Sequence, residues 1–307
     1  MMKKVLFGLM LAVLMVGCRE AKVSNSGLVP TLREEVPEKL EPGTENVESV
    51  TEEVETFTEN VKPSTKKVKP ATAAVATPDL LKQRVARGPP EKLLTRKGYV
   101  TSYNKTTRTP NWVAWMLTKE HTYGKMQRDE QRFEEDPDVP TPRATFQDYY
   151  NSRYDRGHMC PAGDNKWDQE AMTESFLMTN ICPQNHGLNK EDWNELEIQC
   201  RTWARRFGEL TIVCGPLFED EHPRQIGRNK VTVPSAFFKV VCRQKPEPHA
   251  IGFIFRNDGS PQPWRGQAVS VDEVERRAGI DFFFDLPDDV EDAVESEEGL
   301  EHWRTVK

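Results

Sequence analysis

Aromatic residues are almost absent from the beginning of this 307-residue chain. Residues 19–90 contain no tryptophan, no tyrosine and a single phenylalanine, and they show no sustained helical or alternating pattern of apolar residues. Such a segment buries too little apolar surface to offset the entropy lost on ordering. The sequence therefore predicts a disordered tether over residues 18–90, with an r.m.s. reach of about 50 Å for a flexible coil.

Closely spaced cysteine pairs are also lacking, which argues against a structural zinc site. Five of the six cysteines lie between residues 160 and 242. An odd number in that region leaves at least one thiol free or paired outside the chain. Cys160 lies two residues after His158 and Cys182 lies in the loop before Asn189, so these two could form a disulfide, although the sequence does not fix the pairing.

Long apolar runs are confined to the N-terminus. Residues 5–16 follow two lysines and end at Gly17-Cys18, and this run is too short for a comfortable membrane span but typical of an export signal. The small residue before the cysteine resembles the lipobox of bacterial lipoproteins, in which residues 1–17 are removed and Cys18 is lipidated. We therefore expect an exported outer-membrane lipoprotein, anchored to the membrane through Cys18 and facing the periplasm or the cell surface. A secreted protein or an uncleaved anchor is the alternative.

Negative charge dominates only toward the ends of the chain. Residues 281–307 carry ten acidic and two basic residues, and we predict an acidic tail over residues 289–307. Residues 81–280 carry 30 basic and 27 acidic residues, a net +3, although the whole chain is at −7. The middle region is thus compatible with a polyanionic substrate, which the net charge alone would have argued against.

The middle region alternates apolar runs with turn signals, and this pattern predicts one α+β domain over residues 91–288. We expect a hairpin formed by residues 98–104 and 112–117, followed by a long surface loop over residues 121–150. Helices are expected at residues 166–178, 190–207 and 269–278. Further strands are expected at residues 210–214, 231–233, 236–242 and 250–255.

The most informative motif is Asp155-Arg156-Gly157-His158, which is followed by Asn189 and Glu197. Phosphodiester hydrolysis requires a base, neutralisation of the phosphate charge and stabilisation of the leaving oxygen. A neutral imidazole is a competent base, and Mg²⁺ keeps most of its waters and needs only one or two protein oxygens. The spacing therefore predicts metal-assisted hydrolysis. The alternative is a surface ion pair, with Asn189 capping a helix and Glu197 simply exposed.

Several other segments resemble landmarks of the DNA/RNA non-specific endonucleases, the ββα-metal or His-Me finger nucleases that include endonuclease G. The resemblance covers about residues 95–288 and implies an α+β fold, a ββα-metal finger with a central, mainly antiparallel sheet flanked by helices. The matching segments are residues 180–184 (NICPQ), 188–189 (LN), 193 (W), 196–197 (LE), 214–218 (CGPLF) and 279–283 (GIDFF).

The resemblance also implies catalytic roles. His158 matches the general base, and Asn189 matches the protein ligand to a single divalent ion, Mg²⁺ or alternatively Mn²⁺. Glu197 matches the carboxylate that holds a metal-bound water, and Arg156 matches a cation on the phosphate side. Asp155 is assigned only a structural part, in placing Arg156 and His158.

Further residues are implied to shape the substrate site. Asn180 and Gln184 match positions that bind or orient the substrate. The family also has an arginine in the loop before the motif, and Arg128, Arg132 and Arg143 compete for that role. We favour Arg132.

The implied function is endonucleolytic cleavage of DNA and/or RNA with little sequence specificity, leaving 5′-phosphate products. No obligate protein partner is evident. One rival function is a catalytically inactive surface lipoprotein that binds nucleic acid. Another is a phosphodiesterase that acts on a small or lipid phosphodiester.

Overall fold

The computed structural model describes residues 84–85 and 91–304, which all belong to one compact unit, Pro70–Lys307. The predictions for Cys18, for the export signal and for nearly all of the tether concern residues outside these ranges. Within the described ranges, no helix has the length and apolar character needed to cross a membrane.

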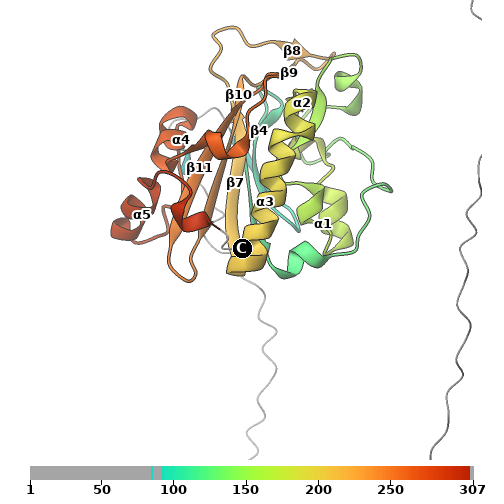
Figure 1. Cartoon of the computed structure of the whole chain (residues 1–307). Helices are drawn as coiled ribbons and strands as arrows, with labels where there is room; N and C mark the ends of the chain where they lie inside the picture. Colours follow the sequence, from blue (N-terminus) through green and yellow to red (C-terminus); the bar gives the residue numbers. More distant parts are fainter. Residues whose placement is uncertain (1–83, 86–90, 305–307) are drawn as a thin grey trace, which may run out of the picture. The chain divides into compact units, whose positions relative to one another are not determined.

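A seven-stranded antiparallel sheet forms the centre of this unit (Figure 1). Its strands in spatial order are β12 (Ala268–Val269), β11 (His249–Arg256), β10 (Ala236–Arg243), β7 (Glu209–Leu217), β4 (Thr109–Thr118), β3 (Val100–Asn104) and β2 (Glu91–Thr95). The predicted hairpin is confirmed as the β3–β4 pair, and the strands predicted at residues 210–214, 236–242 and 250–255 are confirmed as β7, β10 and β11. The predicted α+β class is therefore correct.

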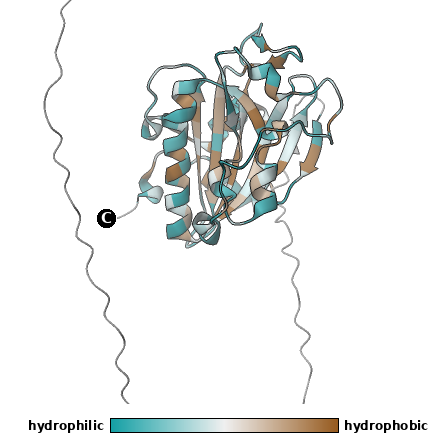
Figure 2. Cartoon of the chain, turned by 90° about the vertical axis from the view of Figure 1, so that its right-hand side faces the viewer, coloured by the Kyte–Doolittle hydropathy of each residue, from teal (hydrophilic) through white to brown (hydrophobic). Residues whose placement is uncertain are grey.

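Helices cover both faces of the sheet. Alternate side chains of a strand point to opposite faces, and β10 shows the consequence. Phe237 belongs to the core that contains Trp193 of α3 (Asp192–Phe207), whereas Phe238 belongs to the core that contains Val274 of α4 (Val271–Ala278). Figure 2 shows apolar residues concentrated along the strands and hydrophilic residues on the outer sides of the helices.

The three predicted helices are confirmed, but each begins later than predicted, and the first also ends earlier. The helix expected at residues 166–178 is α1 (Gln169–Glu174), because the Asp168 side chain accepts a hydrogen bond from the Ala171 N–H and caps it. The helix expected from residue 190 begins only at Asp192, after a break from the short helix α2 (His186–Lys190). Helix α4 is capped by Ser270, whose Oγ accepts a hydrogen bond from the Glu273 N–H.

The acidic C-terminal segment is folded, which differs from the tail predicted for residues 289–307. Helix α5 (Asp288–Glu295) packs against β11 and buries Val294. Trp303 is buried, with its ring centroid 4.8 Å from that of Trp203, and its carbonyl oxygen accepts a hydrogen bond from Trp203 Nε1 at 2.8 Å. A few apolar anchors thus hold a segment whose charge predicted an extended tail.

Short elements complete the described chain. Three two-stranded sheets pair β1 (Arg84–Val85) with β13 (Ile280–Asp281), β5 (Asp155–His158) with β6 (Ile181–Gln184), and β8 (Gln225–Ile226) with β9 (Val231–Thr232). The strand predicted at residues 231–233 therefore forms, but outside the central sheet. The 3₁₀ turns are Glu120–Tyr123, Phe146–Tyr149, Ala162–Asp164, Met178–Asn180, Trp264–Gln267 and Glu301–Trp303.

Candidate active site

Two short strands and the helices that follow them carry the motif residues. β5 pairs antiparallel with β6, so that His158 lies opposite Ile181, and α2 follows β6 after one residue. That residue, Asn185, caps α2 because its side chain accepts a hydrogen bond from the Gly187 N–H at 2.9 Å. Asn189 therefore lies inside a helix and is not a helix cap, which removes the structural alternative considered for it.

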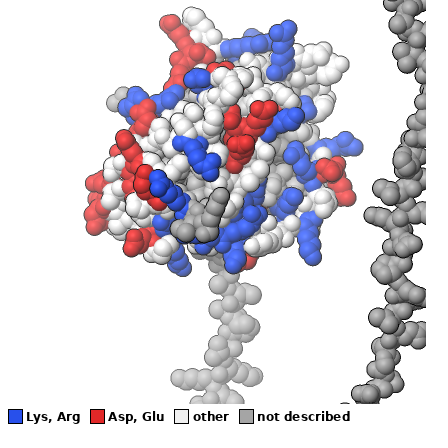
Figure 3. Space-filling model, in the orientation of Figure 1, with Lys and Arg blue, Asp and Glu red and all other residues white. Residues whose placement is uncertain are grey.

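His158, Asn189 and Glu197 line one pocket of about 450 Å³, together with Arg156. The side chains that line it include more cations than anions, and Figure 3 shows mainly Lys and Arg on the right-hand part of the molecule, the side of α1 and α2. A pocket of this charge favours a polyanionic ligand. The charged lining residues are Arg128, Arg156, Lys166, Lys190 and Arg201, against Asp155 and Glu197.

The His158 imidazole packs against two phenyl rings, with centroids 5.3 Å from Phe133 and 4.9 Å from Phe176. Burial, reinforced by the positive charges of Arg128 and Arg156, lowers the pKa of His158 to about 3. Its Nε2 atom is buried, and no described protein group forms a hydrogen bond with it. The ring is therefore neutral at physiological pH.

Asp155 orients the Asn189 amide. Asn189 Nδ2 donates a hydrogen bond to Asp155 Oδ2 at 2.9 Å, and His186 Nδ1 lies 2.8 Å from the same oxygen. Because a carboxylate only accepts, the NH₂ group of Asn189 must face Asp155, which leaves its Oδ1 for another partner. Asp155 was predicted to place Arg156 and His158, but its side chain forms hydrogen bonds with Asn189 and His186 instead.

Glu197 is half-buried on α3 among several charges. Burial raises its pKa to about 7, against the opposing effects of Lys239 and Arg201. Lys239 is fully buried, and its Nζ lies 4.3 Å from the ring centroid of Trp193. A divalent ion beside Glu197 would favour its charged form, so this carboxylate and the free oxygen of Asn189 form a donor set that suits Mg²⁺.

Two arginines are held in the pocket by different contacts. The Arg156 guanidinium carbon lies 4.9 Å from the ring centroid of Phe133 and 4.6 Å from that of Phe146. Such cation–π contacts orient the side chain without using its N–H groups. Arg201, one helical turn after Glu197, donates from Nη1 to Asp164 Oδ1 at 2.7 Å.

The loop arginine that lines the pocket is Arg128, and not Arg132, which the sequence analysis favours for this role. Arg132 is exposed and does not line the pocket. Arg143 is used elsewhere, since it donates to Glu135 Oε2 and to the Val139 carbonyl oxygen, both at 3.0 Å. A loop without periodic structure gives the sequence no means of ranking these three residues.

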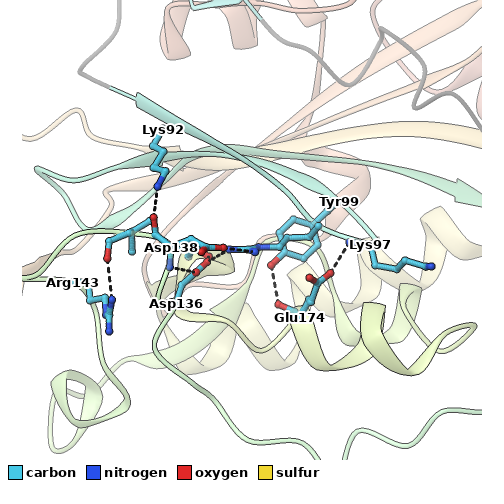
Figure 4. A network of polar contacts seen from close by, with 10 residues as sticks. Lys92, Lys97, Tyr99, Asp136, Asp138, Arg143 and Glu174 are labelled. Carbon is cyan, nitrogen blue, oxygen red and sulfur yellow. Dashed lines mark hydrogen bonds and ion pairs between the residues drawn. The ribbon is translucent and has the colours of Figure 1, made fainter.

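A polar network fixes this loop against the strand edge (Figure 4). Arg96 donates to Asp136 Oδ2 at 2.5 Å and to Asp138 Oδ2 at 2.8 Å. Tyr99 Oη donates a hydrogen bond to the backbone carbonyl oxygen of Glu174. The side-chain carboxylate of Glu174 accepts another from the Lys97 N–H. The loop that carries Arg128 is therefore anchored to the chain that connects β2 to β3.

Asn180 and Gln184, predicted to bind the substrate, are fully buried and do not line the pocket. Asn180 donates to the carbonyl oxygens of Cys160 and Ser175 at 2.9 and 2.8 Å, and it accepts from the Cys160 N–H. Gln184 packs on Gly157 so closely that a Cβ at Gly157 would lie 2.2 Å from Gln184 Oε1. Both side chains hold β5, β6 and the following loop together.

The five cysteines in the described part of the chain are all free and buried. The candidate disulfide between Cys160 and Cys182 is therefore not formed. Burial raises the pKa of both thiols, which keeps them protonated and unreactive.

Some residues at or near the site escaped the sequence reasoning. Arg201 had a signal, because it lies four residues after Glu197 and such residues share a helix face. Asn257 had none. It accepts from the Asn185 N–H at 2.7 Å and donates to the carbonyl oxygens of Pro183 and Pro234, which fixes the connection between β6 and α2.

Comparison with known proteins places this geometry in a family. The sequence profile of the DNA/RNA non-specific endonucleases matches residues 78–289. The chain belongs to this family. The resemblance on which the predicted ββα-metal finger fold rested is thereby confirmed.

Several nucleases are similar to this chain over the same region. The mitochondrial nuclease EXOG of Danio rerio is 37% identical over 201 residues, which cover 60% of this chain and 59% of that protein. Nuclease C1 of Cunninghamella echinulata var. echinulata is 35% identical over 212 residues, 64% of this chain and 84% of that protein. The match thus spans less than two thirds of the EXOG protein.

A solved structure of the EndoG/EndoGI complex, described as showing the mechanism of EndoG inhibition, gives a TM-score of 0.60 with 30% identity. The superposed region covers 64% of this chain and 86% of that chain. The family fold therefore extends over most of that neighbour's length.

The localisation predicted from the N-terminus is wrong by this comparison. The EXOG relatives from Danio rerio, Xenopus laevis, Mus musculus and Homo sapiens are named as mitochondrial, as are the nucleases of Schizosaccharomyces pombe and Saccharomyces cerevisiae. An export signal and a mitochondrial targeting segment are both short N-terminal sequences, so a local pattern is a weak guide to destination.

Proposed function

We propose that this chain is a divalent-metal-dependent endonuclease that hydrolyses phosphodiester bonds of DNA and/or RNA with little sequence specificity. The observation that carries the proposal is the convergence of His158, Asn189 and Glu197 on one pocket with an excess of Lys and Arg. Family membership supports the reaction class. The order of the motif residues along β5, β6 and the following helices supports their assignment to one site.

In the proposed mechanism, His158 removes a proton from the attacking water. Its low pKa keeps the acceptor neutral, and the two phenyl rings restrict its orientation. Arg156 and Arg128 offer guanidinium groups to the phosphate oxygens, where they would stabilise the charge that develops in the transition state.

Asn189, held by Asp155, and Glu197, acting through water, would hold Mg²⁺, with Mn²⁺ as a substitute. When bound, the ion would neutralise phosphate charge and stabilise the leaving 3′ oxygen. Asp155 would act on this reaction only through Asn189, by keeping the amide oxygen turned toward the pocket. The products would carry 5′-phosphates.

Substrate binding in this proposal depends on phosphate contacts. Such contacts carry no sequence information and are weakened by salt through counterion release. Cleavage of DNA and RNA should therefore fall steeply as ionic strength rises, whatever the base sequence.

The proposal is tested with purified, EDTA-treated full chain on plasmid DNA and on RNA. We expect cleavage of at least one polymer after Mg²⁺ is restored, slower or comparable cleavage with Mn²⁺, and none in EDTA. End-labelling of the fragments should find phosphate at the 5′ ends. Cleavage that is unchanged in EDTA would contradict the metal dependence.

The same experiment separates the rival functions. Binding of nucleic acid without cleavage would favour the inactive binding protein. Hydrolysis of a small model diester by a protein that leaves both polymers intact would favour the non-nucleolytic phosphodiesterase. Either result would overturn the proposed endonuclease function.

A further inference from the structure

Three carboxylates from two helices meet on the face of the sheet opposite α3. Asp272 and Glu275 lie on α4, and Glu295 is the last residue of α5. Each offers one oxygen, and the three oxygens lie within 4.8 Å of one another. Figure 1 shows α4 and α5 side by side at the left of the sheet, and Figure 3 shows acidic side chains along this edge.

Glu295 is the exceptional member of this cluster. Glu295 is only 6% exposed, and its Oε1 atom has no hydrogen-bond partner among the described residues. An unpartnered buried carboxylate oxygen is costly, because it has lost its water without gaining a donor. Asp272 is exposed and Glu275 half-buried, so the cluster runs from the surface to this buried oxygen.

Among the described residues, the charges that act most strongly on Glu295 are negative. Burial raises its pKa to about 9, and the charges that raise it further are those of Glu275, Glu291, Asp272 and Asp281. Burial likewise raises the pKa of Glu275 to about 7, and its Oε1 accepts a hydrogen bond from the Phe282 N–H. Three carboxylate oxygens within 4.8 Å of one another repel, and a bound cation would stabilise them.

The arginines of α4 are engaged outside the cluster. Arg276 forms a two-point contact with Glu273, at 2.8 and 2.6 Å. Arg277 forms another with Glu219, at 2.7 and 2.8 Å. The two basic side chains of α4 thus neutralise carboxylates outside the cluster.

We propose that Asp272, Glu275 and Glu295 bind a divalent cation, Ca²⁺. Calcium takes six to eight oxygen ligands in flexible geometry, so three carboxylates that differ in exposure suit it, with waters on the exposed side. Magnesium demands a stricter octahedron and retains more of its own waters, and zinc prefers nitrogen and sulfur ligands in structural sites.

The site would act as a clamp between α4 and α5. The ion would give the buried Oε1 of Glu295 the partner that it lacks among the described residues, and it would join α5 to α4. None of the three ligands lines the pocket of His158, so the inference does not rest on the proposed function. Its expected effect is on stability and ion binding.

The test is calorimetric titration of the EDTA-treated full chain with Ca²⁺, combined with thermal unfolding. Wild type should bind one Ca²⁺ that Glu295→Gln does not bind, with a Kd of about 10⁻⁵ to 10⁻³ M. Saturating Ca²⁺ should raise the Tm of wild type and leave that of Glu295→Gln unchanged. Asp272→Asn, at an exposed position that does not threaten folding, should weaken binding by about 10-fold.

Two matched variants locate the ion. Glu298→Gln, an exposed neighbour outside the cluster, should bind Ca²⁺ as wild type does. Asn189→Ala should also retain this ion, because it alters only the pocket of His158. Equal Ca²⁺ binding by wild type, Glu295→Gln and Asp272→Asn would overturn the proposal, as would the absence of binding at about 5 mM Ca²⁺. Tighter binding of Mg²⁺ than of Ca²⁺ at these residues would overturn the choice of ion.

Discussion

Two glutamates on opposite faces of the sheet, Glu197 and Glu295, have carboxyl groups whose pKa is raised by burial, to about 7 and about 9. Lys239 and Arg201 oppose the effect at Glu197, whereas other carboxylates reinforce it at Glu295. Burial alone therefore does not distinguish a catalytic carboxylate from a structural one. The charges around each group do, and they predict different consequences of substitution.

The largest difference is expected in activity. Glu197→Gln should lower kcat/KM for nucleic acid by about 10²–10³, because it removes the carboxylate that is proposed to hold a metal-bound water. Glu298→Gln, an exposed glutamate on the opposite face, should leave it unchanged. Initial rates on plasmid DNA measure both. Near-wild-type activity of Glu197→Gln would contradict the proposed catalytic role of Glu197.

Asp155→Asn sharpens the comparison within the pocket. The new amide no longer requires the NH₂ group of Asn189 to face it, so the Asn189 oxygen loses its fixed direction. The Mg²⁺ concentration for half-maximal activity should rise about 10–100-fold, as is usual when the partner of a metal ligand is lost. A fall in kcat with an unchanged Mg²⁺ requirement would refute this role.

The pH dependence of the stability of Glu295→Gln tests the description of Glu295. A glutamate with a raised folded-state pKa binds more protons when folded, so its contribution to stability is lost as pH rises from about 4.5 to about 9. In EDTA, the Tm advantage of Glu295→Gln over wild type should therefore grow across this range, by roughly 2–4 °C for each kcal/mol. A constant difference in Tm between pH 5 and 9 would show that Glu295 does not titrate as described.

The smallest effect is expected for Phe146→Ala. It removes one of the two rings that orient Arg156, and a contact of this kind contributes about 0.5–1 kcal/mol when exposed. KM should rise roughly 2–5-fold with little change in kcat. Phe207→Ala is unsuitable as a control because its ring packs on Arg243. Tyr123→Ala is unsuitable for the same reason, since its ring packs on Arg205. The exposed Tyr150→Ala, which does not line the pocket, serves instead.

Residues that follow a periodic pattern were predictable. Strands β3, β4, β7, β10 and β11 alternate or are continuously apolar, and α4 has its Ser270 cap in sequence. His158, Asn189 and Glu197, on β5, α2 and α3, were found because they lie at family spacings. Local pattern and global fold agree at such positions.

Residues placed by long-range contacts were not predictable. Arg128 reaches the pocket only because its loop is anchored to the edge of the sheet, while Arg132 on the same loop does not. Asn180 and Gln184 match family positions but are buried, and burial of a polar side chain depends on partners distant in sequence. Trp303 likewise finds Trp203 about 100 residues away, which no count of acidic residues reveals.

The central claim is that His158 is the base of a nuclease site, and kcat of His158→Ala measured beside His222→Ala tests it most directly. Both variants should bind a labelled oligonucleotide as wild type does. His158→Ala should lose about 10²–10⁴ of the cleavage rate in Mg²⁺, the usual contribution of a general base. His222→Ala, exposed and outside the pocket, should lose none. Equal cleavage by His158→Ala and wild type would contradict the account.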